Sequence, residues 1–164
     1  MKAKFAFILV LIAAFLTGNS QNLKIPKTGD LKKTGESVQK AASSTVSIGN
    51  LVGELTSNIS DNSLTDSFKT RKAGFTEKAG KTSDPAALGG SLADLSEGIK
   101  PTAMDAGWGA VKGKFVKDAK SATTVKTVAG LAGQLESHIS PGSFKGSWAK
   151  ARPAWQSALS TISK

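Results

Sequence analysis

The strongest constraint on this chain is an internal repeat of 40 residues. When the sequence is shifted against itself by 40 positions, large apolar residues coincide in six columns and no gap is needed. The columns are Ile48, Leu88, Val128; Leu55, Leu95, Leu135; Ile59, Ile99, Ile139; Leu64, Met104, Phe144; Phe68, Trp108, Trp148; and Phe75, Phe115, Trp155. Chance alone would give fewer than about one such column. The sequence therefore predicts three structural units, over residues 45–84, 85–124 and 125–164.

Each unit is expected to be a pair of helices. In residues 45–59, 85–99 and 125–139 the apolar residues recur at spacings of three and four, which is typical of one helix face. A break follows each stretch, where Pro101 and Pro141 suit the first turn of a second helix and Ser140 is a candidate N-cap. Leu64 and Phe68 then share a face of that second helix. No segment alternates with the period of a strand, so the predicted fold class is all-α.

A single helical hairpin cannot bury its apolar face, whereas stacked hairpins bury theirs against each other. We therefore expect three tandem helix–turn–helix repeats in a short, right-handed, α-solenoid-like stack, with a compact six-helix bundle as the alternative. Two small residues four positions apart, such as Gly49 and Gly53, recur in each first helix. They predict the close approach of another helix, because Gly otherwise destabilises a helix by up to about 1 kcal/mol.

The first 20 residues have the pattern of a cleaved signal peptide. Two lysines precede the apolar run 5–16, and small residues at positions 18 and 20 fit a cleavage site at Ser20–Gln21. The run is shorter than the roughly 20 apolar residues that a membrane span needs. We expect a secreted or periplasmic protein without a transmembrane anchor. Residues 21–44 contain Lys, Gly and Pro and few apolar residues, and are expected to form a basic, flexible leader.

Composition and spacing exclude most catalytic sites. The chain has no Cys and one His, so it has no thiol nucleophile, disulfide framework or Cys-bearing metal site. Neither a Gly-x-Ser-x-Gly nucleophile elbow nor a phosphate-binding loop occurs. We therefore expect no enzyme, no catalytic residue, no metal and no cofactor. The alternative of an exported enzyme with an unrecognised site would be favoured by a deep pocket at His138 beside a carboxylate.

Charge is more informative than catalytic chemistry. The chain has 22 Lys+Arg against 12 Asp+Glu, a formal charge of +10. In the predicted stack, Lys72, Lys112 and Arg152 would form a ladder with about 10 Å between rungs, flanked by Lys114 and Lys150. Such a ladder can hold an extended polyanion.

The repeat, the basic ladder and the signal peptide together predict a secreted, non-enzymatic helical-repeat binding or structural module. Its expected partner is an acidic polysaccharide or protein, with no specific recognition of nucleic acid. The first alternative is a cationic membrane-active protein that uses amphipathic helices.

The last unit has no following unit to cover it in a linear stack. Trp155, Leu159 and Ile162 are therefore expected to leave an apolar patch at the C-terminal end. Such a patch would support a weak homo-oligomer.

Overall fold

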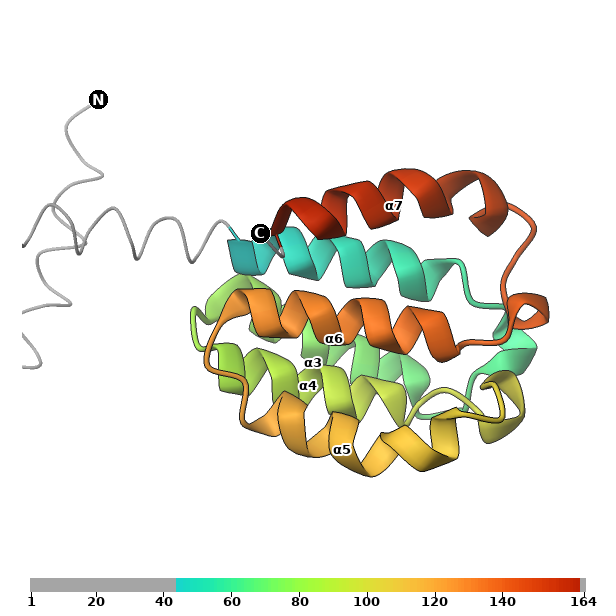
Figure 1. The fold of residues 1–164 in the computed structure, drawn as a ribbon, viewed down its shortest axis with the longest axis horizontal. Helices are drawn as coiled ribbons and strands as arrows, with labels where there is room; N and C mark the ends of the chain where they lie inside the picture. Colours follow the sequence, from blue (N-terminus) through green and yellow to red (C-terminus); the bar gives the residue numbers. More distant parts are fainter. Residues whose placement is uncertain (1–43, 163–164) are drawn as a thin grey trace, which may run out of the picture. The chain divides into compact units, whose positions relative to one another are not determined.

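The computed structural model describes residues 44–162, which contain six α-helices and only isolated β-bridges in place of strands (Figure 1). The helices cover residues 44–57, α3 (Phe68–Lys81), α4 (Pro85–Ser96), α5 (Trp108–Lys120), α6 (Val125–His138) and α7 (Trp148–Ile162). The all-α prediction is confirmed for this part of the chain. The predicted signal peptide, and the predicted leader up to residue 43, lie outside the described residues.

Each 40-residue segment contributes a first helix and a second helix. The first helices are residues 44–57, α4 and α6, and the second helices are α3, α5 and α7. Local capping explains where α4 and α6 begin. Asp84 accepts a hydrogen bond from Ala86 N with Pro85 in the first turn of α4, and Thr124 accepts one from Thr127 N at the start of α6.

The predicted start of the second helices is wrong. Pro101 and Pro141 begin short 3₁₀ turns, η2 (Pro101–Ala103) and η3 (Pro141–Ser143), which match η1 (Asp61–Ser63) in the first segment. Ser140 precedes η3 without a capping side-chain bond. The second helices begin several residues later, because the intervening residues are extended and pair with another segment.

Main-chain pairing joins the three 3₁₀ turns into a closed ring at one end of the helices (Figure 1, right). The bridges pair Leu64 with Ile99, Met104 with Ile139, and Phe144 with Ile59. They connect the first segment to the second, the second to the third, and the third back to the first. This closed arrangement differs from an open α-solenoid-like stack, whose first and last units stay apart, and corresponds to the compact six-helix alternative.

Two main-chain hydrogen bonds support each bridge. Thr65 N donates to Gly98 O at 2.9 Å, and Lys100 N donates to Ser63 O at 2.9 Å. The corresponding bonds are Asp105 N to His138 O and Ser140 N to Ala103 O, then Lys145 N to Asn58 O and Ser60 N to Ser143 O, all between 2.7 and 2.9 Å. Equivalent residues of the three junctions, such as Thr65, Asp105 and Lys145, are 40 positions apart in sequence, so the junctions have the same register.

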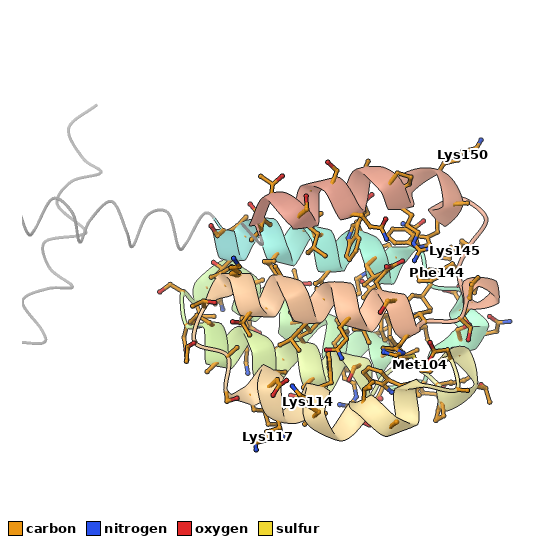
Figure 2. All side chains as sticks on the ribbon, in the orientation of Figure 1. Met104, Lys114, Lys117, Phe144, Lys145 and Lys150 are labelled. Carbon is orange, nitrogen blue, oxygen red and sulfur yellow. The ribbon has the colours of Figure 1, made fainter. Side chains whose placement is uncertain are left out.

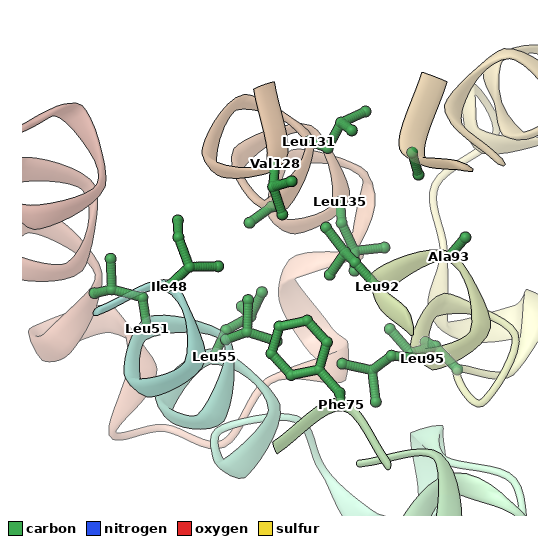
Figure 3. Packing of buried hydrophobic residues seen from close by; sticks show 14 of the residues in the cluster. Ile48, Leu51, Leu55, Phe75, Leu92, Ala93, Leu95, Val128, Leu131 and Leu135 are labelled. Atoms are coloured by element: carbon green, nitrogen blue, oxygen red, sulfur yellow. The ribbon is translucent and has the colours of Figure 1, made fainter. Parts of the chain in front are cut away.

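The core lies between the first helices and the inward face of the second helices (Figure 3). Leu55 of the 44–57 helix, Leu92 of α4 and Leu135 of α6 approach one another there, and Phe75 of α3 packs beside them. The second helices each bury a narrower face; α3, for example, buries Phe68, Phe75 and Ala79. Within residues 44–162, no helix combines the length and apolar character needed to cross a membrane.

Close helix approach accounts for part of the small-residue pattern. A Cβ added to Gly49 would lie 2.7 Å from the Cβ of Ala79, and one added to Gly89 would collide with the Ala119 carbonyl oxygen. In both segments a glycine of the first helix therefore lies against an alanine of the second. At Gly53 no atom lies within 4 Å of an added Cβ, so that member of the pattern is not explained by packing.

We predict different effects on stability from two neighbouring substitutions in α4. Gly89→Ala should lower the free energy of unfolding by about 2 kcal/mol, because the methyl group forces α4 and α5 apart. Gly90→Ala should be neutral or stabilising by up to about 1 kcal/mol, since its Cβ would meet nothing within 4 Å. Urea denaturation followed by far-UV circular dichroism measures both. Equal effects of the two substitutions would contradict the close packing of α4 against α5.

Candidate functional site

The predicted basic ladder is engaged in contacts with the first helices. Lys72 Nζ donates to Ser57 Oγ at 2.8 Å. Lys112 Nζ lies 2.9 Å from Glu97 Oε2, just beyond α4. Each cation therefore joins the second helix of its segment to the first. Equivalent positions in a closed ring are distributed around its axis, so these side chains do not form a straight ladder.

Arg152 makes the most deeply placed of these contacts. Its Nε lies 2.6 Å from Glu136 Oε1, and the Glu136 side chain is only 2% exposed. Gln156 Nε2 is 3.5 Å from the other carboxylate oxygen. A buried carboxylate is strongly unfavourable without a cation, so Arg152 is required for packing α7 against α6.

Sequence reasoning missed the burial of Glu136. The matched positions are Thr56 and Ser96, which are 2% and 3% exposed. A column of small polar residues within an apolar helix face was the signal that position 136 is buried.

The two lysines predicted to flank the ladder lie far apart. Figure 2 shows Lys114 on α5 and Lys150 at the start of α7, well separated in this view. Lys114 pairs with Asp118 on its own helix. Lys150 is exposed and has no ion-pair partner within residues 44–162. The five predicted basic residues therefore do not form a single surface patch.

The predicted apolar end patch is wrong for two of its three residues. Trp155 is 1% exposed and Leu159 is 8% exposed, and Ile162 is half-buried against the core. The Trp155 indole Nε1 donates to Leu51 O at 2.7 Å. The first segment thus covers the last one, as ring closure requires, and no exposed patch is left at Trp155.

Two surface grooves occupy matching places at the turns that precede α3 and α7. The first-segment groove has a volume of about 380 Å³ and is lined by Asp61, Leu64, Thr65, Asp66, Phe68 and Lys69. The third-segment groove has a volume of about 260 Å³, and Phe144, Lys145, Gly146, Trp148 and Arg152 are among its lining residues. The first groove contains two carboxylates and one lysine. The third contains two cations and no carboxylate.

Aromatic side chains form one wall of the third-segment groove. Phe144 and Trp148 stack with ring centroids 5.2 Å apart and planes inclined by 20°. The Trp148 Nε1 is buried and makes no hydrogen bond within the described residues. In contrast to Trp155, Trp148 therefore has a buried donor without an acceptor.

Positive charge is concentrated beside this groove. Lys145 Nζ donates to Ser57 O at 2.9 Å, close to the Ser57 hydroxyl that accepts from Lys72. Burial, followed by the charge of Lys145, lowers the pKa of Lys72 below its ordinary value. Two ammonium groups thus converge at the C-terminus of the 44–57 helix, where the helix dipole favours cations.

His138 has a carboxylate beside it. Its Nδ1 lies 2.9 Å from Asp105 Oδ1, and because an ionised carboxylate only accepts, Nδ1 carries the donated proton. Asp105 Oδ1 also accepts from Gly107 N and Trp108 N at the start of α5. Neither His138 nor Asp105 lines the two grooves described above. The pair therefore joins the end of α6 to the cap of α5.

Within residues 44–162, no cluster of three or more His, Asp or Glu side chains is arranged to hold a metal ion. The chain matches no known protein family, no curated protein and no solved structure.

We predict that Arg152→Gln destabilises the protein by about 3 kcal/mol, because it leaves the Glu136 carboxylate buried without a cation. The double variant Glu136→Gln, Arg152→Gln should recover most of this loss. Lys112→Gln is the matched control: its pair with Glu97 is 41% and 42% exposed, so its loss should be below about 1 kcal/mol. Urea denaturation of the unmodified protein and these three variants measures the free energies of unfolding. An Arg152→Gln protein as stable as Lys112→Gln would contradict the role of this pair.

We predict that Asp105 stabilises the fold only while it is ionised. The hydrogen bond from His138 lowers the pKa of Asp105, and the two backbone N–H groups add to this effect. Since the folded pKa is lower than the unfolded one, the stabilisation is present above the ordinary aspartate pKa of about 3.9 and is lost as pH falls through the lower folded value. Asn keeps the capping oxygen. Asp105→Asn should therefore destabilise the protein at about pH 7 and much less at about pH 2.5.

Thermal denaturation across this pH range tests the prediction. Asp66→Asn, which removes an exposed carboxylate, is the control. A destabilisation by Asp105→Asn that stays constant with pH would show that the Asp105 charge is not involved.

Proposed function

We propose that this chain is an exported, non-enzymatic helical-repeat module that binds an acidic polymer through cations on its second helices. The observation that carries the proposal is a set of exposed lysines with no ion-pair partner within residues 44–162. They are Lys69 and Lys78 on α3, Lys117 and Lys120 on α5, and Lys150 on α7. Unpaired surface cations retain their full charge toward a polyanion and release its counterions on binding.

The distribution of charge among the helices supports the same proposal. Helix α7 carries Lys150 and Arg152 and no acidic residue, and α5 carries four lysines against Asp118. The first helices, which make most of the core, contain few cations. The basic residues are therefore placed on the outer side of a folded scaffold, where a long polymer can reach them.

The core gives less support to membrane activity. The apolar faces of the helices are used against each other, and Val46, at 47%, is the one large apolar side chain with substantial exposure among the described residues. A membrane-active helix needs an exposed apolar face to contact lipid.

The enzyme alternative is supported by the His138–Asp105 pair alone. Because Asp105 also caps α5, that pair is explained by structure.

We predict that unpaired lysines contribute more to polyanion binding than paired ones. The chain from Gln21, which keeps every described residue, should be retained on a column of immobilised polygalacturonate at low salt. A triple variant of unpaired lysines should lower the salt concentration needed for elution more than a triple variant of paired lysines does. The first set is Lys117→Gln, Lys120→Gln, Lys150→Gln, and the second set is Lys81→Gln, Lys112→Gln, Lys114→Gln. The second set removes the same charge from lysines already paired with Glu77, Glu97 and Asp118. Paired charges release fewer counterions, so the two sets separate a binding surface from total charge.

Two results would count against the proposal. Equal shifts for the two triple variants would mean that retention reflects net charge only. If the unmodified chain elutes from the polygalacturonate column as early as it elutes from uncharged agarose, binding to acidic polysaccharide is excluded.

A further inference from the structure

The third-segment groove presents two cations to any molecule that enters it. Arg152 lines the groove, and its side chain is 46% exposed although its Nε lies 2.6 Å from Glu136 Oε1. Two N–H groups of one guanidinium match the two oxygens of a carboxylate. Lys145 is the second cation of the groove, and its contact with Ser57 O leaves further donors on the ammonium group. Asp61 lies 3.8 Å from Lys145 Nζ, but its side chain is 94% exposed and its attraction is weak.

An apolar wall faces the same space. Phe144 is half-buried, and its ring stacks on Trp148. Figure 2 places Phe144 and Lys145 next to each other at the turn before α7. The groove therefore combines a flat apolar surface with positive charge. Trp148, which also lines it, has a buried indole N–H without an acceptor in the described residues.

The first-segment groove shows which of these features come with the repeat and which do not. Leu64 stands where Phe144 stands, Thr65 replaces Lys145, and Asp66 replaces Gly146. The fold thus produces a groove in both segments. Only the third-segment groove has the stacked aromatic pair and a lining without carboxylates.

We propose that the third-segment groove binds one uronate residue of an acidic polysaccharide. The carboxylate would pair with Arg152 and Lys145, and the apolar face of the sugar ring would lie on Phe144. A volume of about 260 Å³ is below the roughly 300–1,000 Å³ of sites for drug-sized ligands, so it suits a single sugar ring. This inference rests on the proposed function and names the position and chemistry of one site within it.

An acidic peptide is the competing ligand, because glutamate also carries a carboxylate. Its side chain is a flexible methylene chain and offers no flat ring to Phe144. Charge alone would hold both ligands equally, whereas the aromatic wall favours the sugar.

The three indole N–H groups provide separate reporters for a test by NMR. The chain from Gln21, labelled with ¹⁵N, would be titrated with a galacturonic acid hexamer. The Trp148 indole signal should shift, because Trp148 lines the groove. The Trp155 signal should stay in place, since that N–H is bonded to Leu51 O inside the core. Maltohexaose, a neutral glucose hexamer, should shift neither signal.

Gly146→Asp is the variant that addresses the groove without disturbing the fold. A Cβ at Gly146 would meet nothing within 4 Å, and Asp66 is the natural residue at the matching position. The added carboxylate should weaken hexamer binding by about tenfold or more through repulsion of the uronate. Gly109→Asp on α5 is the control, because it makes the same change in net charge at another open position. It should weaken binding by less than about threefold.

Three results would overturn the groove proposal: a hexamer titration that leaves Trp148 unmoved, equal weakening by Gly146→Asp and Gly109→Asp, or tighter binding of a glutamate hexapeptide than of the galacturonic acid hexamer. If the unmodified chain is nevertheless retained on polygalacturonate, polymer binding survives and only this site is wrong. If the column does not retain the chain, the proposed function itself fails.

Discussion

The main-chain pairing of the third segment with the first is the contact on which the rest of the structure depends. Ser60 N donates to Ser143 O, and Lys145 N donates to Asn58 O. These two bonds close a ring whose other junctions would also exist in an open chain of segments. Closure places the 44–57 helix against α7, where Leu51 O accepts the indole N–H of Trp155. An apolar end that would otherwise face water is thereby buried, and no polar capping unit is needed.

Most of the core could be predicted from the sequence, because apolar residues at matching positions have to share an environment. Five of the six apolar columns are buried in every segment. The sixth, Leu64, Met104 and Phe144, was assigned to a helix, since its spacing to Phe68 also fits helical periodicity. Its residues are extended because they form the bridges. Closure itself could not be derived from the repeat, as identical units are compatible with an open stack and with a ring. The apolar character of Trp155 and Leu159 was the available clue, because an open stack ends in a polar surface.

The contacts of the predicted basic residues could not be derived from the sequence. Lys72, Lys112 and Arg152 were predicted to form a ladder for a polyanion, yet they reach back to groups on or next to the first helices. A sequence shows the position of a cation along a helix but not which carboxylate faces it across the interface. Glu136 and Arg152 are 16 positions apart in sequence, and only the crossing of α6 and α7 brings them together. The cations left for a partner are the lysines without an ion-pair partner in the described residues, together with the part of Lys145 and Arg152 that faces the third-segment groove.

Departures from the repeat are therefore more informative about function than the repeat itself. Residues that agree across the three segments are explained by the core, the bridges and the helix crossings. The third segment differs by an aromatic stack, a groove without carboxylates and a second helix with two cations and no acid. The core does not demand these differences, because the first segment builds the same turn with Leu64, Thr65 and Asp66. Arg152 is held at this groove by the buried Glu136 carboxylate, but no packing requirement adds Phe144 and Lys145 beside it. Their concentration there is the reason to place the uronate site at α7, within the wider basic surface of the second helices.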